Sequence, residues 1–332
     1  MKSEKIIAEI ERCWPRLLAG EGIDGDLAQA VVELPGPEIF SLLPWCNRLR
    51  RHHCGRQIAL CAIANAKSGR CGENCAFCAQ SAAYDTGVET FSLISVEELL
   101  SRARTARAAG VENFSVVTSG TAVSQPAEQA RIAAMLEGLA GMGLGPCASL
   151  GFLDAEAVAL YHRAGLKHYH HNLESARSFF PSICTSHAYD RAVETVKMAK
   201  AAGFYVCSGG IMGLGESPAQ RVELALELRQ LEVDSIPLNF LQPVPGTPLA
   251  DQPGLGPLAG LLTIAMFRLV NPARDIRICG GRQRTFGDFQ SLLFAAGANG
   301  LMVGNYLTTR GRQWADDRRL LAEWAEFDGV DG

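Results

Sequence analysis

Three cysteines lie within eight residues, at Cys71, Cys75 and Cys78, in a loop that contains glycine and has no strong helical pattern. The spacing Cys-x3-Cys-x2-Cys lets three thiolates bind three irons of a cubane cluster and leaves the fourth iron without a protein ligand. A small molecule can bind such an open site and react there. The alternative is a zinc loop, but structural zinc normally has four ligands. No histidine or further cysteine lies near enough in sequence to complete one, so the triplet indicates an open [4Fe–4S] cluster.

The elements that must position this loop follow an alternating pattern. From Gln57 onward, short apolar runs alternate with amphipathic stretches rich in Ala, Leu and Arg. Eight strands are predicted near 58–64, 112–118, 145–150, 167–172, 204–208, 234–240, 275–279 and 300–304. Helices are predicted near 95–109, 126–141, 154–164, 189–202, 218–231, 257–270, 285–296 and 313–326.

Eight such units predict a closed (β/α)8 barrel of the TIM type, whose active site lies at the C-terminal ends of the strands. An open doubly wound sheet is the structural alternative. The lone Gly213-Leu214-Gly215 is weak evidence for the dinucleotide site that such a sheet would carry.

The first 55 residues have a different pattern. Apolar residues at helical spacing over 4–18 and 28–43 predict an N-terminal helical extension, residues 1–55, before a barrel domain at 56–332. The chain has 332 residues, of which 48% are hydrophobic, and its net charge is −4. This charge argues against a nucleic-acid or membrane-surface partner. No apolar run approaches the roughly 18 residues of a membrane span.

Cysteine usage bears on location. Eleven cysteines are an odd number, and residues 1–5 are polar rather than the start of a secretory signal. Both observations argue against a secreted disulfide framework. We therefore expect a cytoplasmic protein whose thiols stay reduced and serve partly as metal ligands.

An aromatic residue, Phe77, directly precedes the last cysteine of the triplet. The cysteine spacing together with this aromatic residue resembles the motif of radical S-adenosylmethionine enzymes. Longer segments resemble the biotin synthase family, and the similarity runs from about residue 57 to 310. These segments are 67–81 (KSGRCGENCAFCAQS), 169–174 (YHHNLE), 206–216 (VCSGGIMGLGE), 239–249 (NFLQPVPGTPL) and 306–309 (YLTT).

The resemblance implies a sulfurtransferase that converts dethiobiotin to biotin. S-adenosylmethionine on the [4Fe–4S] cluster would be reduced by one electron and cleaved to methionine and a 5′-deoxyadenosyl radical. The radical would take hydrogen from dethiobiotin, and the carbon radical would take sulfur from an auxiliary iron–sulfur cluster deeper in the barrel. The resemblance also implies a flavodoxin- or ferredoxin-type electron donor and a homodimer.

The resemblance further assigns residues to ligands. Those expected near S-adenosylmethionine are Phe77, Glu174, Arg191, Gly209 and Gly210. Those expected near dethiobiotin are His170, Asn172 and Asn239, the two asparagines at its ureido ring. The two glycines could let backbone approach a ligand or could merely turn the chain. The family often has asparagine where this chain has His170, and the family arginine is displaced by one position to Arg191.

In the family, the auxiliary cluster is held by three cysteines and an arginine. The matching positions here are Ser115, Cys147, Cys207 and Arg277. The cysteine of the second strand is therefore missing, and a serine hydroxyl is a poor substitute for a soft thiolate toward iron.

Two additional cysteines compensate for this loss. Cys61 lies in the first predicted strand, and Cys279 lies two residues after Arg277, on the same face of its strand. A layer inside a (β/α)8 barrel is formed by four side chains from alternate strands. We therefore predict that the auxiliary cluster has four cysteine ligands with Arg277 beside it or bound to it, namely Cys61, Cys147, Cys207 and Cys279. The alternative is that these cysteines are ordinary small hydrophobic residues.

Two other functions remain open at this point. One is a related radical enzyme of the hydrogenase-maturation type, and the other is an iron–sulfur carrier without catalysis. Among the remaining cysteines, Cys184 has little weight as a ligand because it lies in the connection after the fourth strand. Cys13, Cys46 and Cys54 lie in the helical leader and are interpreted as incidental.

Overall fold

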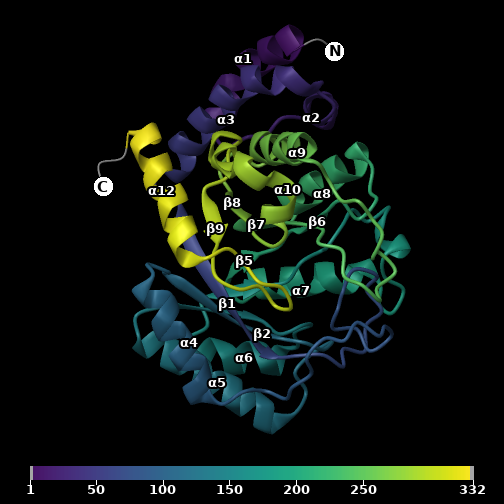
Figure 1. The fold of residues 1–332 in the computed structure, drawn as a ribbon, viewed down its shortest axis with the longest axis vertical. Helices are drawn as coiled ribbons and strands as arrows, with labels where there is room; N and C mark the ends of the chain where they lie inside the picture. The colour runs from purple at the N-terminus through teal and green to yellow at the C-terminus, as the bar shows by residue number, and fades with distance from the viewer. Residues whose placement is uncertain (1–2, 330–332) are drawn as a thin grey trace.

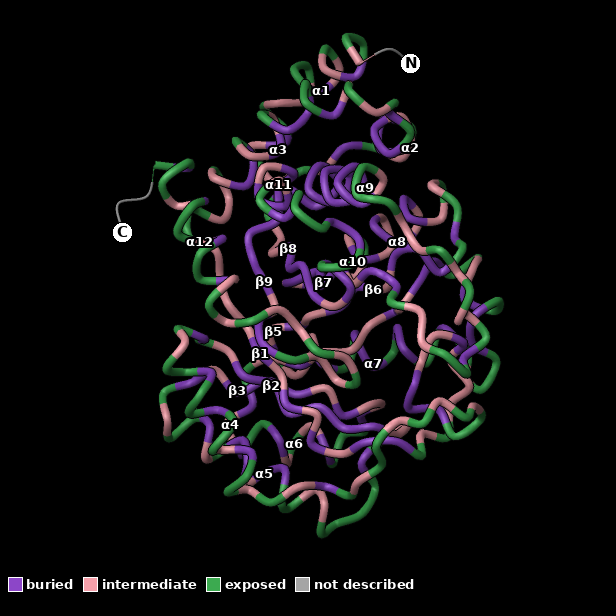
Figure 2. The backbone as a smooth tube through the Cα atoms, in the orientation of Figure 1, coloured by how far each residue is buried: buried purple, intermediate pink, exposed green. Residues whose placement is uncertain are grey.

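The structure is a computed structural model that describes residues 3–329. Met1 and Lys2 of the predicted leader and residues 330–332 of the predicted barrel domain lie outside the described residues. A barrel of parallel strands forms the centre, helices surround it, and the leader helices lie across one end next to α9 (Pro257–Val270) (Figure 1). The tube in Figure 2 is mostly buried along the strands and α9, which places the core there.

Within residues 3–329, nine parallel strands form one sheet. They are β1 (Ala59–Lys67), β2 (Asn113–Thr118), β3 (Gly145–Ser149), β4 (His168–His170), β5 (Tyr205–Cys207), β6 (Gly210–Met212), β7 (Ser235–Phe240), β8 (Asp275–Ile278) and β9 (Gly300–Met302). β5 and β6 both pair with β7 and are separated by only two residues, so together they fill one of eight positions. The pairing of β1 with β9 and of β5 with β7 closes the barrel, as predicted, and the doubly wound alternative is wrong.

The helices between the strands also follow the prediction. They are α4 (Val96–Ala108), α5 (Pro126–Gly141), α6 (Ala155–Arg163), α7 (Tyr189–Ala201), α8 (Pro218–Gln230), α9 and α12 (Trp314–Asp328). The helix predicted near 285–296 is instead α10 (Arg282–Phe286), a 3-10 turn (Gly287–Ser291) and α11 (Leu292–Ala295). Gly287 divides it with a φ of 48°, outside the helical region. Side chains cap α4, α6 and α8 at their starts: Ser95, Asp154 and Ser217 each accept a hydrogen bond from a backbone N–H of the first turn.

The leader consists of α1 (Ser3–Leu18), α2 (Gly25–Val32) and α3 (Ile39–Cys54). It packs on α9, because the Ile23 N–H donates to the Leu269 carbonyl at 3.0 Å. A Cβ at Gly22 would lie 1.9 Å from the Val270 carbonyl oxygen, so this approach requires glycine. The leader is thus joined tightly to the barrel wall, and the boundary at residue 55 stays a prediction.

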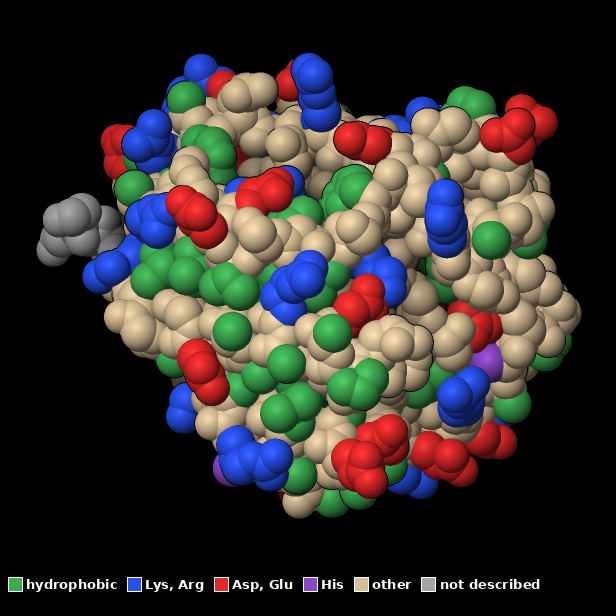
Figure 3. All heavy atoms as spheres, turned by 90° about the horizontal axis from the view of Figure 1, so that it is seen from below, with side chains coloured by type: hydrophobic (Ala, Val, Ile, Leu, Met, Phe, Trp, Pro, Cys, Tyr) green, Lys and Arg blue, Asp and Glu red, His purple; other side chains and the backbone are tan. Residues whose placement is uncertain are grey.

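The surface has a mixed character. In Figure 3, acidic, basic and hydrophobic side chains are interspersed over the face shown, which agrees with the small net charge of −4. Over residues 3–329, no helix has the length and apolar character needed to cross a membrane.

A buried ion pair joins the leader to the last helix. Arg50 of α3 and Asp328 of α12 lie 2.7 Å apart, with side-chain exposures of 0% and 1%. Arg50 also donates to the carbonyls of Gly55 and Arg56, where the chain leaves α3. Removal of one partner leaves a buried charge unpaired, which costs far more than the pair contributes when both are present.

We therefore expect Asp328→Ala to lower the free energy of unfolding by about 3–5 kcal/mol. The matched control is Glu98→Gln, which breaks the exposed pair with Arg102 and should cost less than about 1 kcal/mol. Urea denaturation of both variants measures the difference. Equal losses in the two variants would contradict the structural importance of the buried pair.

Candidate functional site

A cavity of about 460 Å³ extends from the loops after the strands into the barrel. Seven thiols line it: Cys61, Cys71, Cys75, Cys78, Cys147, Cys207 and Cys279. Cys61 lies in β1, and the triplet follows the end of β1 at Lys67. The thiols therefore form two sets, an outer set on the loop and an inner set on the strands.

The outer set is held by a short turn. The Cys78 N–H donates to the Cys75 carbonyl at 3.0 Å, and the Cys71 N–H donates to the Gln80 carbonyl at 3.0 Å. Burial and, to a lesser extent, the neighbouring Cys71 raise the pKa of Cys78 to about 11. Burial raises the pKa of Cys75 as well. Three gathered thiols, two of which resist ionisation on their own, fit a cationic metal centre, since such a centre displaces their protons.

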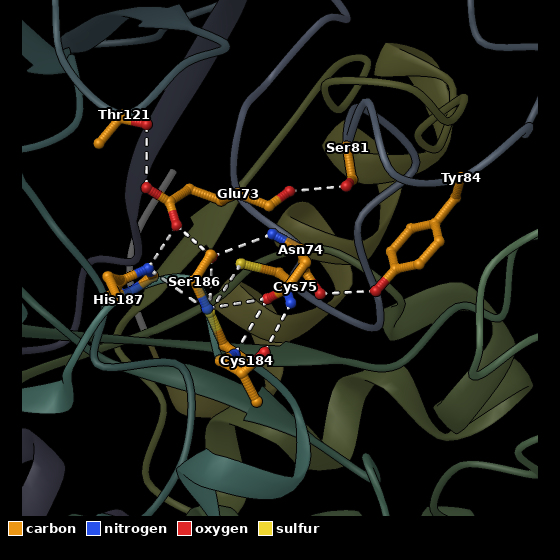
Figure 4. Close-up of polar contacts among 10 residues, drawn as sticks. Glu73, Asn74, Cys75, Ser81, Tyr84, Thr121, Cys184, Ser186 and His187 are labelled. Atoms are coloured by element: carbon orange, nitrogen blue, oxygen red, sulfur yellow. Dashed lines mark hydrogen bonds and ion pairs between the residues drawn. The ribbon is translucent and has the colours of Figure 1, made fainter.

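A hydrogen-bond network fixes the loop from the side (Figure 4). Glu73, inside the triplet, accepts from Thr121 at 2.9 Å, from the ring N–H of His187 at 2.7 Å, and from Ser186. Burial alone would raise the pKa of Glu73, but these bonds outweigh it and hold the pKa below its ordinary value. The sequence prediction missed Glu73 and His187. The position of Glu73 within the motif was the only available signal.

The inner set comes from different strands of the barrel. Cys61, Cys147 and Cys207 lie in β1, β3 and β5, and Cys279 directly follows β8. Burial raises the pKa of all four thiols, that of Cys207 to about 12, and the nearby Cys61 also raises the pKa of the other three. The structure thus brings together the four cysteines predicted from strand alternation. Their role as ligands stays a prediction.

Arg277 lies beside the inner thiols and is held as a cation. Its guanidinium donates to Asp275 at 2.9 Å and to Ser235 at 3.2 Å. Burial alone would lower the pKa of Arg277, but Cys61 and Asp275 outweigh it and raise the pKa. Within the described residues its buried Nη1 has no hydrogen-bond partner. Arg277 lines the same cavity as the inner thiols, and an unpaired buried donor there fits an acceptor such as cluster sulfur.

Ser115 pairs in register with Cys147 between β2 and β3 and lines the same cavity. Its buried Oγ has no hydrogen-bond partner within residues 3–329. The hydroxyl therefore faces the space where the inner thiols meet.

The predicted substrate residues His170, Asn172 and Asn239 line the cavity, as do Phe77 and Glu174. The Asn172 amide donates to Glu174 at 3.3 Å, and its oxygen accepts from the Gly209 N–H at 3.2 Å. Burial raises the pKa of Glu174 to about 7. Its φ of 67° is uncommon for a residue other than glycine. Strain of this kind concentrates at functional sites.

Three predicted cofactor residues lie outside the cavity lining. A Cβ at Gly209 would lie 2.0 Å from the Pro237 carbonyl oxygen, and one at Gly210 would lie 2.4 Å from the Glu174 carbonyl oxygen. The close approach of the β7 backbone at Pro237 and of the Glu174 backbone therefore requires these glycines. Arg191 stacks 4.0 Å above the ring of Phe152, which does line the cavity. Contact of these three residues with the cofactor stays a prediction.

Comparisons with known proteins agree with this site. The Radical SAM superfamily matches residues 66–228, and the Biotin and Thiamin Synthesis associated domain matches residues 237–325. Biotin synthase of Nitratidesulfovibrio vulgaris strain DP4 is 50% identical over 91% of this chain and 84% of its own length. Biotin synthase of Geobacter sulfurreducens is 50% identical over 93% of this chain and 94% of its own length.

Solved structures support the fold alone, because their identity is low. Methylornithine synthase has a TM-score of 0.80 at 19% identity, over 96% of this chain and 99% of its own. The FeFe-hydrogenase maturase from Carboxydothermus hydrogenoformans has a TM-score of 0.78 at 13% identity, over 97% of this chain and 84% of its own. The similarity to the hydrogenase maturase therefore concerns the fold and not the activity.

The sequence relatives confirm the predicted resemblance and the class of enzyme. They also confirm the cofactors that the class uses, a [4Fe–4S] cluster with S-adenosylmethionine and an auxiliary iron–sulfur cluster. The high identity extends over nearly the whole of this chain and most of each relative. The chain therefore belongs to the biotin synthase family.

Proposed function

We propose that this chain converts dethiobiotin to biotin in the cavity described above. The observation that carries the proposal is that the outer and inner thiols line one cavity, with Asn172 and Asn239 lining it as well. When bound, the two clusters and S-adenosylmethionine supply the radical that removes hydrogen and the sulfur that replaces it. Cys71, Cys75 and Cys78 hold the outer cluster, and the barrel wall excludes water from the reacting atoms.

The two asparagines bind and orient the substrate. Asn239 already accepts from the Gly280 N–H at 2.9 Å, and Asn172 is held by Glu174 and Gly209. Each amide is therefore oriented before the substrate enters, which lowers the entropic cost of binding. A ureido ring offers both N–H donors and a carbonyl acceptor to such amides.

The inner thiols hold the sulfur source. Cys61, Cys147, Cys207 and Cys279 are its ligands, and Arg277 stays a cation that donates hydrogen bonds rather than an iron ligand. Two observations support the role of Arg277 as a donor and not a ligand. Asp275 pairs with its guanidinium at 2.9 Å, and arginine does not readily lose its proton.

An external one-electron donor, of the flavodoxin or ferredoxin type, reduces the outer cluster. We further propose a homodimer and a cytoplasmic location, where thiols remain reduced. Residues 1–55 form a helical extension, and residues 56–332 form the catalytic barrel.

The first test concerns the outer triplet. Any one of Cys71→Ala, Cys75→Ala or Cys78→Ala should abolish reductive cleavage of S-adenosylmethionine, since three thiolates are needed to hold an open cubane. Iron and sulfide counting, Mössbauer spectra and 5′-deoxyadenosine release measure the effect after anaerobic reconstitution. Cys13→Ala, in the leader, is the control and should behave as wild type. Undiminished 5′-deoxyadenosine from one triplet variant would refute the assignment.

The second test concerns substrate binding. Asn172→Ala or Asn239→Ala leaves polar ligand atoms unpaired, which costs about 1–3 kcal/mol, or roughly 5- to 150-fold in affinity for dethiobiotin. Equilibrium binding under anaerobic conditions measures it, with the iron content confirmed to be that of wild type. Unchanged affinity in both variants would point to a different substrate.

The third test concerns the inner thiols. Cys61→Ser and Cys279→Ser should each lower auxiliary iron and the yield of biotin, while outer-cluster iron and 5′-deoxyadenosine formation remain largely intact. Ser115→Ala is the matched control on the same cavity wall and should change little, because a hydroxyl is a weak iron ligand. Loss of auxiliary iron in Ser115→Ala, with none in Cys61→Ser, would exclude the four-cysteine set.

A further inference from the structure

An eighth cysteine, Cys184, lies against the outer triplet. Its side chain is 4% exposed, and its Sγ is 3.8 Å from the Sγ of Cys75 (Figure 4). In the sequence the two residues are separated by more than a hundred positions. The contact therefore depends on how the segment 183–187 is held against the cluster loop.

Backbone and amide hydrogen bonds fix that segment. The Ala76 N–H donates to the Ile183 carbonyl at 2.8 Å, directly beside the two sulfurs. The Asn74 oxygen accepts from the N–H groups of Thr185 and Ser186 at 3.0 and 3.1 Å. These bonds lie on both sides of Cys184, so its position relative to Cys75 is set by the backbone.

The neighbouring side chains donate their protons to Glu73 rather than to Cys184. Ser186 donates to Glu73, and the ring N–H of His187 also donates to Glu73, at 2.7 Å. Ser186 Oγ already accepts from the Asn74 N–H at 3.1 Å. Without iron, the Cys75 thiol donates to Cys184 Sγ at 3.8 Å. His187 Nδ1 lies 3.4 Å from Cys184 Sγ, but its proton is donated to Glu73, so this nitrogen is no acceptor. Once Cys75 has lost its proton to iron, the Cys184 thiol has two acceptors in range, Ser186 Oγ at 3.4 Å and Cys75 Sγ.

Binding of iron to Cys75 decides between these acceptors. An iron-bound thiolate carries negative charge and has no proton of its own, whereas the Ser186 oxygen is neutral and already accepts one bond. Hydrogen bonds to charged acceptors are the stronger ones. We propose that Cys184 is a positioning residue that donates an S–H···S hydrogen bond to the Cys75 thiolate and thereby raises the reduction potential of the outer cluster.

The effect on the potential follows from charge. Reduction adds an electron that is shared by iron and the ligand sulfurs, so a proton donor at a ligand sulfur stabilises the reduced form more than the oxidised form. Hydrogen bonds to sulfur are among the factors that set iron–sulfur potentials, and partners of metal ligands commonly tune the metal in this way. The inference rests on the proposed role of Cys75 as a cluster ligand.

A metal ion bound by the network itself would be a different arrangement. One ligand atom from each of Glu73, Cys184 and His187 lies within 4.8 Å of the other two. The carboxylate of Glu73 already accepts three hydrogen bonds, so an ion there would have to displace them. The observed hydrogen bonds favour the thiol as a donor, and zinc analysis tests the other arrangement.

The experiment compares Cys184→Ala, Cys184→Ser and wild type after anaerobic reconstitution of the full chain. Redox titration is followed by the electron paramagnetic resonance signal that changes when S-adenosylmethionine is added, which identifies the outer cluster. Cys184→Ala should shift the equilibrium against the reduced cluster by roughly tenfold, or about 59 mV for one electron, toward a more negative potential. Cys184→Ser keeps a proton donor and should restore much of the shift.

Cys46→Ala is the matched control, because Cys46 is also a buried thiol but lies in the leader helix α3. The outer cluster of this variant should have the reduction potential of wild type. An unchanged potential in Cys184→Ala overturns the proposal. Equal shifts in the Ala and Ser variants also overturn it, since they would indicate lost packing rather than a lost donor. Stoichiometric zinc in wild type that disappears in Cys184→Ala would also overturn the proposal, because it would show that Cys184 is a zinc ligand and not a hydrogen-bond donor.

Iron and sulfide counts separate this inference from the ligand assignment. Cys75→Ala should lose the outer cluster, whereas Cys184→Ser should keep wild-type iron and sulfide. If Cys75→Ala keeps the cluster, the proposed function fails at that residue. If Cys75→Ala loses it while Cys184→Ala and wild type titrate at the same potential, only the role of Cys184 fails. If Cys184→Ala does not load its cluster, the potential of Cys184→Ser decides, and a shift of tenfold or more there refutes the donor.

Discussion

Closure of the barrel is the constraint on which the site depends. β1 pairs with β9 and β5 pairs with β7, so residues from the two ends of the chain face one interior. Cys61 and Cys279 are separated by more than two hundred residues, and both line the same cavity. In an open sheet they would lie on strands at a distance from each other. The strand pairs that close the barrel are therefore also those that gather the inner thiols.

Closure also explains why the strand glycines are needed. The segment from β5 to β6 lies so close to the backbone of Pro237 in β7 and of Glu174 that a Cβ at Gly209 or Gly210 would overlap their carbonyl oxygens. The sequence interpretation considered only a ligand or a turn as the reason for these glycines. Interatomic distances between strands cannot be derived from a local pattern, so the strand-packing reason could not be predicted.

Most of the fold was predictable because its signals are local. Helix positions follow from amphipathic stretches, and strand positions follow from short apolar runs. The inner thiols were predictable from strand alternation, which is a regular geometric rule. Cys184 could not be placed in the same way. Its contact with Cys75 depends on the hydrogen bond between Ala76 and Ile183, two loop residues to which no periodicity applies.

The two thiol sets have different charged neighbours, and the difference matches their chemistry. Glu73 and Glu174 both line the cavity with the outer triplet. Burial raises the pKa of Glu174, whereas hydrogen bonds hold that of Glu73 below its ordinary value, so Glu73 is the carboxylate that stays charged. A negative charge opposes the addition of an electron to the cluster proposed on the triplet, which would make the reduced cluster a stronger reductant. The inner thiols instead have Arg277, which Asp275 keeps in place as a cation. A fixed cation stabilises negative charge on the inner sulfurs, so the two ends of one cavity offer different electrostatic surroundings to the two clusters proposed there.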